Sequence, residues 1–228
     1  MRVDFVANAS HELRTPLSSL VGFIETLQGP AANDSEARDR FLRIMQGEAN
    51  RMSRLVEDLL SLSRIEMNAT QKPNAPVDVA AIARTVQESL ELKADANGQV
   101  IEIEINGDTV VAGDQDELTQ VIWNLTDNAI KYSAFDSTIK IRIKQQISTQ
   151  SVTISVKDQG DGIAAEHLGR LTERFYRIDK ARSRQLGGTG LGLAIVKHIL
   201  NRLDAAMEIK STVGKGSTFK VSIPIFGH

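Results

Sequence analysis

The chain has 228 residues, of which 41% are hydrophobic, and this suits one or two globular domains with a sizeable core. Its formal net charge of -2 argues against a nucleic-acid partner, and the lack of cysteine excludes disulfides and thiolate metal sites. No uninterrupted apolar run reaches the roughly 18 residues needed to span a bilayer. No secretory signal peptide opens the chain, so we expect a cytoplasmic module.

Two long helices are predicted at the start. The first covers residues 3–28 and ends at Gly29 and Pro30, and the second begins near Ser35. Its apolar residues, three and four apart where the series is unbroken, form a stripe typical of helix bundles: Met45, Met52, Leu55, Leu59 and Leu62. A hairpin with one apolar stripe per helix buries it by pairing with a second copy. The sequence therefore predicts a helical hairpin that dimerises into a four-helix bundle.

The polar segment "NATQKPNAPVD" separates this hairpin from a second region. We place one domain at 1–69, a linker at 70–77 and a second domain at 78–228. Four segments of the second domain alternate apolar and polar residues, as strands do: "VIEIEI", "TIKIRIKQQI", "SVTISVKD" and "TFKVSIPI". Helices are predicted between them at 79–96, 116–132 and 191–203. This mixture predicts an α+β fold or a two-layer α/β sandwich.

The helical segment "NLTDNAIKYS" places Asn124, Asn128 and Lys131 on one face. Asparagine oxygens can ligate Mg²⁺ and a lysine can neutralise phosphate, so this face suits a metal–phosphate group. A solvated polar face is the alternative. Trp123, next to this face, is predicted to pack in the core.

A turn follows the strand "SVTISVK", in the sequence "DQGDGI". Gly160 and Gly162 allow a tight turn close to a ligand, and Asp158 could accept a hydrogen bond from an exocyclic amine such as that of adenine. A plain strand-exit turn is the alternative. A glycine-rich loop that runs into a helix, "GGTGLGLAIVKHI", favours a phosphate through its free N–H groups. The cationic run "RLTERFYRIDKARSRQ" between the two glycine elements suits a mobile lid over a polyphosphate.

These motifs, in this order after "FVANASHELRTPL", resemble the dimerisation and ATP-binding core of bacterial sensor histidine kinases, most closely the phosphate-regulon sensor kinases. The other matching stretches are "NLTDNAIKYS", "DQGDGI", "ERFYRID" and "GGTGLGLAIVKHI". The resemblance implies an ATP-binding domain of the GHKL (Bergerat) type. It also implies a homodimer, a response-regulator receiver domain as partner, and a longer protein anchored in the inner membrane.

On this chain, the resemblance implies that Mg-ATP phosphorylates His11, which passes the phosphoryl group to an aspartate of the regulator. Glu12 would hydrogen-bond one ring nitrogen of His11 and raise the nucleophilicity of the other. Thr15, at i+4 from His11, would help to place a hydrolytic water, which implies a phosphatase activity. Pro16 leaves the Glu12 carbonyl without its helical partner and should bend the helix.

The resemblance also assigns the nucleotide contacts. Asn128 would ligate Mg²⁺ with help from Asn124, Lys131 would reach phosphate, Tyr132 would flank the nucleoside and Asp158 would recognise adenine. Gly160 and Gly162 would shape the adenine wall, and Phe175 and Tyr176 would anchor the lid. Arg177 and Arg184 are the candidates for the γ-phosphate. The phosphate loop would comprise Gly188, Thr189, Gly190, Leu191 and Gly192.

Two other classes of protein compete with the kinase. A degenerate kinase kept as a dimeric scaffold would be favoured by the loss of His11, Asn128 or Asp158, and all three are present. A related ATPase or chaperone would not need the "HELRT" helix.

Overall fold

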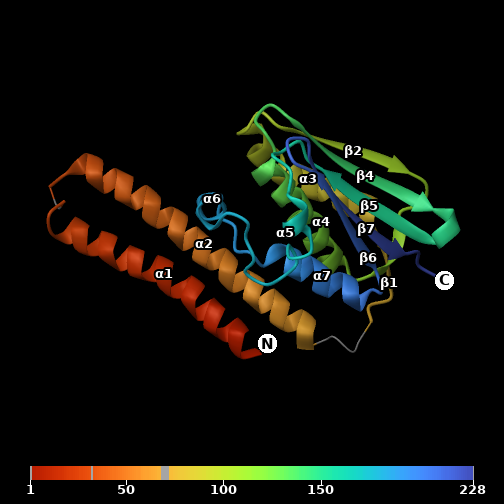
Figure 1. The fold of residues 1–228 in the computed structure, drawn as a ribbon, viewed down its shortest axis with the longest axis horizontal. Helices are drawn as coiled ribbons and strands as arrows, with labels where there is room; N and C mark the ends of the chain where they lie inside the picture. The colour runs from red at the N-terminus through yellow and green to blue at the C-terminus, as the bar shows by residue number, and fades with distance from the viewer. Residues whose placement is uncertain (1, 32, 68–71, 228) are drawn as a thin grey trace. The chain divides into compact units, whose positions relative to one another are not determined.

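The computed structural model describes residues 2–31, 33–67 and 72–227, and it divides into two compact units (Figure 1). The first, here called the hairpin unit, comprises the residues up to Ser63 together with Arg174–Leu191. The second, the sheet unit, comprises Arg64–Glu173 together with the residues from Gly192 onward. The segment Arg174–Leu191, which the sequence assigns to the second domain, therefore packs with the first.

The hairpin unit contains the two predicted long helices, α1 (Arg2–Gln28) and, as far as Ser63, α2 (Ser35–Met67). Asp34 accepts a hydrogen bond from the Ala37 N–H at 2.9 Å and so caps the start of α2. Leu55 and Leu62 of the predicted stripe are fully buried. Pro16 lies inside α1, which continues past it, and the bend expected there stays a prediction. Of the helices in the described ranges, none is long and apolar enough to cross a membrane.

The segment 174–191 carries one short helix, α6 (Lys180–Gln185). The Asp179 carboxylate caps it by accepting from the N–H groups of Ala181 and Arg182. A main-chain hydrogen bond joins the two ends of this segment: the Phe175 N–H donates to the Gly190 carbonyl at 2.8 Å. Gly190 has a φ of +77°, and an added Cβ would lie 2.9 Å from the Phe175 Cα, so only glycine fits there.

The sheet unit is a two-layer α/β sandwich, as predicted. Its strands in sheet order are β2 (Val100–Asn106), β4 (Thr138–Gln146), β5 (Ser151–Lys157), β7 (Gly216–Pro224) and β6 (Ala206–Thr212). The β2–β4 pair is parallel and the other pairs are antiparallel. The helices packed on this sheet are α3 (Val79–Asp95), α4 (Gln115–Tyr132) and α7 (Gly192–Arg202) (Figure 1). They bury one face of every central strand, which gives the unit a continuous apolar core.

Three strands and, besides α6, two short elements were not predicted from the sequence. β1 (Ala75–Asp78) pairs antiparallel with β3 (Val110–Gly113), so part of the predicted linker 70–77 is a strand. Residues 70 and 71 of that linker, together with residues 68 and 69 before it, lie outside the described residues. The third strand is β6, and the short elements are η1 (Ile147–Thr149) and α5 (Ala165–Leu168).

The prediction that Trp123 packs in the core is wrong, because its side chain is 39% exposed. Leu118, Ile122 and Leu125 already form the buried face of α4. A residue one position beyond Ile122 is turned about 100° away from that face. The tendency of tryptophan to be buried therefore does not place Trp123 in the core, because its position on the helix turns it away from the buried face of α4.

Candidate functional site

His11, the candidate phosphoacceptor, lies on the exposed side of α1. Its ring makes no hydrogen bond or ion pair within the described ranges. Thr15 lies one turn further on, also exposed, and its hydroxyl donates to the His11 carbonyl oxygen at 3.2 Å. A free and exposed imidazole can present a ring nitrogen to an incoming phosphoryl group.

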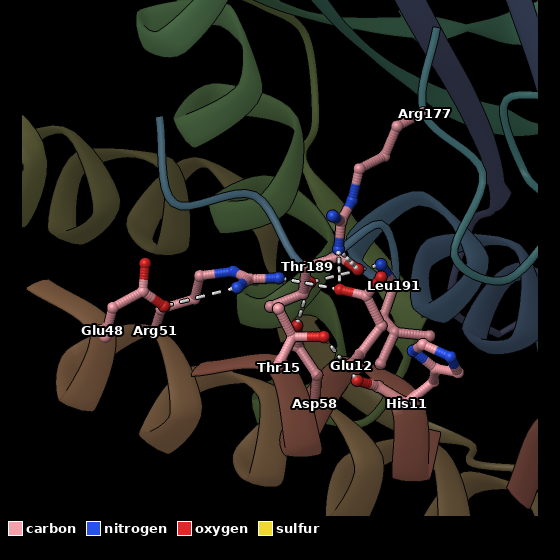
Figure 2. Close-up of polar contacts among 9 residues, drawn as sticks. All are labelled: His11, Glu12, Thr15, Glu48, Arg51, Asp58, Arg177, Thr189 and Leu191. Atoms are coloured by element: carbon pink, nitrogen blue, oxygen red, sulfur yellow. Dashed lines mark hydrogen bonds and ion pairs between the residues drawn. The ribbon is translucent and has the colours of Figure 1, made fainter. Parts of the chain in front are cut away.

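Figure 2 shows that the Glu12 carboxylate and the His11 ring point in different directions. Successive residues of an α-helix are about 100° apart, so adjacent side chains do not face each other. No hydrogen bond joins the two in this structure, although one was expected between the Glu12 carboxylate and the His11 ring. Glu12 is instead half-buried and faces basic side chains.

Two arginines converge on one oxygen of Glu12 (Figure 2). Arg51 of α2 approaches Glu12 Oε2 at 2.7 Å, and Arg177 of the segment 174–191 approaches the same atom at 3.0 Å. Glu48 lies 3.5 Å from Arg51 on the other side. The arginine side chains are only 5% and 4% exposed. Arg177 also donates to the Thr189 carbonyl at 2.5 Å.

The glycine-rich loop also contacts the hairpin within this unit. Thr189 donates to Asp58 Oδ2 of α2 at 2.6 Å, and its hydroxyl accepts from the Leu191 N–H at 3.2 Å. The Phe175 ring packs near Phe5 of α1, with centroids 6.0 Å apart. Arg184 lies in α6, and its side chain is outside the described part of the chain.

Sequence analysis missed Arg51 and Asp58, although a signal for them was present. With Leu55 and Leu62 they occupy positions four and three apart, which is the spacing of a buried helical seam. Charged residues are almost never fully buried unless paired. Two charges in line with a buried stripe therefore indicate a polar cluster inside the hairpin unit.

In the sheet unit, α4 presents the predicted asparagine face. Asp114 caps this helix by accepting from the N–H groups of Asp116 and Glu117. Asn124 and Asn128 are half-buried, and neither carboxamide makes a hydrogen bond with a described residue. Asn124 Oδ1 would lie 2.7 Å from a Cβ added to Gly192, the first residue of α7. Both carboxamide oxygens are therefore available to a ligand.

Asp158 ends β5 as a buried carboxylate, 4% exposed. Its Oδ1 accepts from the N–H groups of Gly160 at 3.0 Å and Ser217 at 2.9 Å. Burial raises the pKa of Asp158 above its ordinary value, and the hydrogen bonds from the Gly160 and Ser217 N–H groups oppose that rise. Oδ2 makes no hydrogen bond with a described residue, so it remains an acceptor of defined direction.

Gly160 and Gly162 follow Asp158 because the backbone leaves no room for a side chain. A Cβ on Gly160 would lie 1.9 Å from the Tyr132 carbonyl oxygen. A Cβ on Gly162, whose φ is +72°, would lie 2.1 Å from the Thr212 carbonyl oxygen. The two glycines thus allow the turn after β5 to pack against the end of α4 and the end of β6.

Lys131, predicted to reach phosphate, is held within α4. Its ammonium lies 2.6 Å from Asp127 Oδ2, and Lys93 of α3 pairs with the other oxygen of Asp127. Tyr132 is partly exposed at the end of the same helix. The phosphate role of Lys131 stays a prediction, and it requires the ammonium to be shared with, or released by, Asp127.

The residues of the sheet unit fit Mg-ATP. Asp158 offers an acceptor for adenine, and Asn124 and Asn128 offer uncommitted amide oxygens on one helix face. The described residues contain no group of three or more His, Cys, Asp or Glu side chains that could hold a metal ion. A magnesium ion here would draw on amide and phosphate oxygens, which suits a metal that usually keeps few protein ligands.

Comparison with known proteins agrees with this geometry. Residues 1–68 match the His Kinase A (phospho-acceptor) domain family, and residues 113–226 match the family described as histidine kinase-, DNA gyrase B-, and HSP90-like ATPases. The chain belongs to the sensor histidine kinases. The second match implies ATP binding by residues 113–226.

Curated relatives are longer sensor histidine kinases. The phosphate regulon sensor protein PhoR of Pseudomonas aeruginosa is 42% identical over 219 residues, which cover 96% of this chain and 49% of PhoR. The sensor histidine kinase WalK of Bacillus subtilis is 37% identical over 223 residues, covering 98% of this chain and 36% of WalK. The chain thus spans about half or less of the length of these relatives.

Solved structures of histidine kinases have the same fold. AdeS of Acinetobacter baumannii gives a TM-score of 0.71 at 28% identity, covering 96% of this chain and 98% of that one. The kinase ThkA, solved in complex with response regulator protein TrrA, gives a TM-score of 0.76 at 23% identity. It covers 97% of this chain and 61% of that chain, and at this identity it supports the fold alone.

Proposed function

We propose that the chain is the cytoplasmic catalytic core of a two-component sensor histidine kinase. Mg-ATP phosphorylates His11, and the phosphoryl group then passes to an aspartate of a response-regulator receiver domain. In the first step the bond from the γ-phosphorus to its bridging oxygen breaks, a phosphorus–nitrogen bond forms, and ADP leaves. The use of Mg-ATP agrees with a cytoplasmic location.

One contrast supports this proposal most directly. The His11 ring is exposed, whereas the Asp158 carboxylate is buried and held in a fixed orientation. A nucleophile must reach its substrate, whereas a group that recognises adenine must stay fixed. His11 is exposed without a partner in the described residues, and Asp158 is fixed by backbone N–H groups. This division of roles is what transfer from a bound nucleotide to a separate helix requires.

The predicted nucleotide contacts become roles in this proposal. Asn128, with Asn124 beside it on α4, holds Mg²⁺ at the phosphates. Arg184 of the segment 174–191 neutralises the γ-phosphate during transfer, joined by Arg177 when Glu12 releases it and by Lys131 when Asp127 releases it. Thr15 positions the water for phosphatase activity on the phosphorylated regulator.

The proposed kinase is a homodimer, and the hairpin unit supplies the contact. Its helices leave large apolar side chains exposed: Val6, Leu17, Val21, Ile24, Leu42, Ile44, Val56 and Leu60. Leu17, Val21 and Ile24 are four and three positions apart and so share one face of α1, and an exposed apolar stripe of this kind marks an association surface. A second hairpin packed on these residues completes the four-helix bundle predicted from the sequence.

The response regulator is the second proposed partner. ThkA, with this fold, was solved in complex with response regulator protein TrrA. On this chain the receiver domain must bring an aspartate to His11, so it docks beside the exposed face of α1. Thr15 lies on that face, within reach of the same aspartate after transfer.

The test is incubation with γ-labelled ATP and Mg²⁺, followed by detection of acid-labile, base-stable label. The chain, its His11→Gln variant and a His167→Gln control are compared. His167 is the matched control because it lies in α5 of the sheet unit, away from the phosphoacceptor helix in the sequence. We expect label in the chain and in the control, and none in His11→Gln.

Label that persists in His11→Gln would overturn the assignment of the phosphoacceptor. If the chain binds ATP and takes up no label, the scaffold hypothesis replaces the kinase. A regulator carrying aspartyl phosphate then separates a true scaffold from a core held in its phosphatase state, since only the latter releases inorganic phosphate.

A further inference from the structure

Arg51 is a buried cation that neither the proposed transfer chemistry nor the apolar seam of α2 explains. It lies in the middle of α2, its side chain is 5% exposed, and it pairs with Glu12 at 2.7 Å and Glu48 at 3.5 Å. The free energy needed to desolvate a guanidinium exceeds the stabilisation that an exposed ion pair gives. A buried arginine therefore indicates a specific structural or functional role.

The position of Arg177 suggests that task. Its guanidinium donates to the same Glu12 oxygen, Oε2, and also to the Thr189 carbonyl. Glu12 therefore bridges a cation of the hairpin and a cation of the segment 174–191. Among the described residues, Nε of both arginines is buried without a hydrogen-bond partner, so their Nη contacts within the cluster are what hold them (Figure 2).

A glutamate side chain has several rotamers, and only some of them aim the carboxylate at the segment 174–191. Arg51 selects among these, because its bond to Oε2 fixes the carboxylate on the side away from His11 (Figure 2). Glu48, one turn before Arg51 on α2, orients the guanidinium in turn.

We propose that Arg51 is a positioning residue: it holds the Glu12 carboxylate so that Arg177 anchors the segment 174–191 beside the phosphoacceptor helix. The contribution of this anchor to phosphoryl transfer rests on the proposed kinase function. The anchor itself does not, and the two are measured separately.

The experiment is hydrogen–deuterium exchange on the full chain, read in peptides from 174–191 and from α2. Three variants are compared with the unmodified chain: Arg51→Met, which removes the charge, Arg51→Lys, which keeps it, and Arg43→Met as the matched control. Arg43 is also on α2, but it is exposed and, among the described residues, donates only to the Asp39 carbonyl of its own helix. Autophosphorylation at saturating ATP and direct ATP affinity are measured on the same samples.

We expect Arg51→Met to speed exchange in 174–191 by about tenfold, the effect of losing one anchoring ion pair on a local opening equilibrium. Exchange in α2 should be unchanged, Arg51→Lys should restore most of the protection, and Arg43→Met should behave as the unmodified chain. The autophosphorylation rate of Arg51→Met should fall while its ATP affinity stays the same.

Unchanged exchange in 174–191 overturns the proposal. Faster exchange throughout α2 also overturns it, because Arg51 would then act only on the stability of the hairpin. Failure of Arg51→Lys to restore protection has the same meaning, since the anchor requires the cation. If the chain takes up no label at all, the kinase proposal fails while the exchange results still decide the role of Arg51.

Discussion

Asp158 in the sheet unit is buried, and two backbone N–H groups hold one of its oxygens. His11 in the hairpin unit is exposed, and its ring makes no hydrogen bond or ion pair with a described residue. The same contrast holds for the cores of the two units. The sheet unit buries the apolar faces of its strands and helices, whereas α1 and α2 leave many large apolar side chains exposed. The sheet unit thus has its own apolar core, although it also exposes large apolar side chains such as Leu92 and Phe135, whereas we propose that the hairpin unit completes its core with a second copy.

The largest expected effect tests that dependence. Leu60→Asp on α2 places a charge where we propose the second copy packs; Leu60 is 52% exposed in the single chain. Each dimer contains the change twice, so lost burial and charge desolvation together should weaken association by about 4 kcal/mol, roughly a thousandfold. Analytical ultracentrifugation should show a monomer where the unmodified chain is a dimer.

Leu92→Asp is the matched control for the dimer test. Leu92 is 86% exposed on α3 of the sheet unit, and its substitution should leave the sedimentation coefficient unchanged. A Leu60→Asp chain that still sediments as a dimer would show that the exposed side of α2 is not the association surface.

The next effect tests the self-sufficiency of the sheet unit. Gly160→Ala forces a Cβ to within 1.9 Å of the Tyr132 carbonyl oxygen, so the turn after β5 or the end of α4 must shift. We expect a loss of about 3 kcal/mol in the free energy of unfolding of the sheet unit. Calorimetry should show one transition moving to lower temperature, while the α2 peptides keep their protection in hydrogen exchange.

Gly169→Ala provides the control for the glycine test. Gly169 has a φ of -67°, and nothing lies within 4 Å of an added Cβ. Its substitution should change the unfolding transition by less than about 0.5 kcal/mol. Equal destabilisation by the two substitutions would mean that the close approach of Gly160 to Tyr132 does not set the stability of the turn.

A smaller effect concerns nucleotide recognition. Asp158→Asn replaces a charged acceptor, and the affinity for ATP should fall by about 2 kcal/mol, roughly thirtyfold, as measured by titration calorimetry. Glu104→Gln, at a half-buried position of β2 where the carboxylate pairs with Arg142, should leave the affinity unchanged. A full-affinity Asp158→Asn variant would contradict the adenine role.

The pH dependence follows from the raised pKa of Asp158, which burial causes against the opposing Gly160 and Ser217 hydrogen bonds. Above the raised pKa the carboxylate is charged, so its burial costs stability and it accepts from adenine. As the pH falls through that pKa the proton binds, the cost disappears and recognition weakens. The ATP affinity of the unmodified chain should therefore fall as the pH falls through the raised pKa of Asp158. The affinity of Asp158→Asn should fall less steeply over the same pH range.

Sequence predicted the sheet unit better than the segment 174–191, for a physical reason. Strand alternation and helical period record burial, so the helices α3, α4 and α7 and the strands β2, β4, β5 and β7 could be found from their patterns. β1 was assigned to the linker because Pro76 and the short run around it resemble a connection. Antiparallel pairing with β3 is a long-range contact that leaves little local signal.

The candidate site shows the same limit. Asp158, Asn124 and Asn128 could be picked out as candidate nucleotide contacts because each lies in a short, local motif. The cluster of Glu12, Arg51 and Arg177 joins residues 39 and 165 positions apart, and no local pattern links them. The partner of Glu12 was misplaced because adjacency in sequence was taken for adjacency in space.

The smallest expected effect belongs to Asp127, which ties α4 to α3 in the sheet unit. Burial alone raises the pKa of Asp127, but the charges and hydrogen bonds of Lys131 and Lys93 outweigh it and hold the pKa below its ordinary value. The stability that results is fully present above the ordinary pKa and is lost as the pH falls through the lowered one. Asp127→Asn should therefore cost about 1 kcal/mol near neutral pH and almost nothing in strong acid. Urea unfolding of the sheet unit at several pH values measures this difference, and a cost that stays constant into acid would show that Asp127 acts through packing and not through its charge.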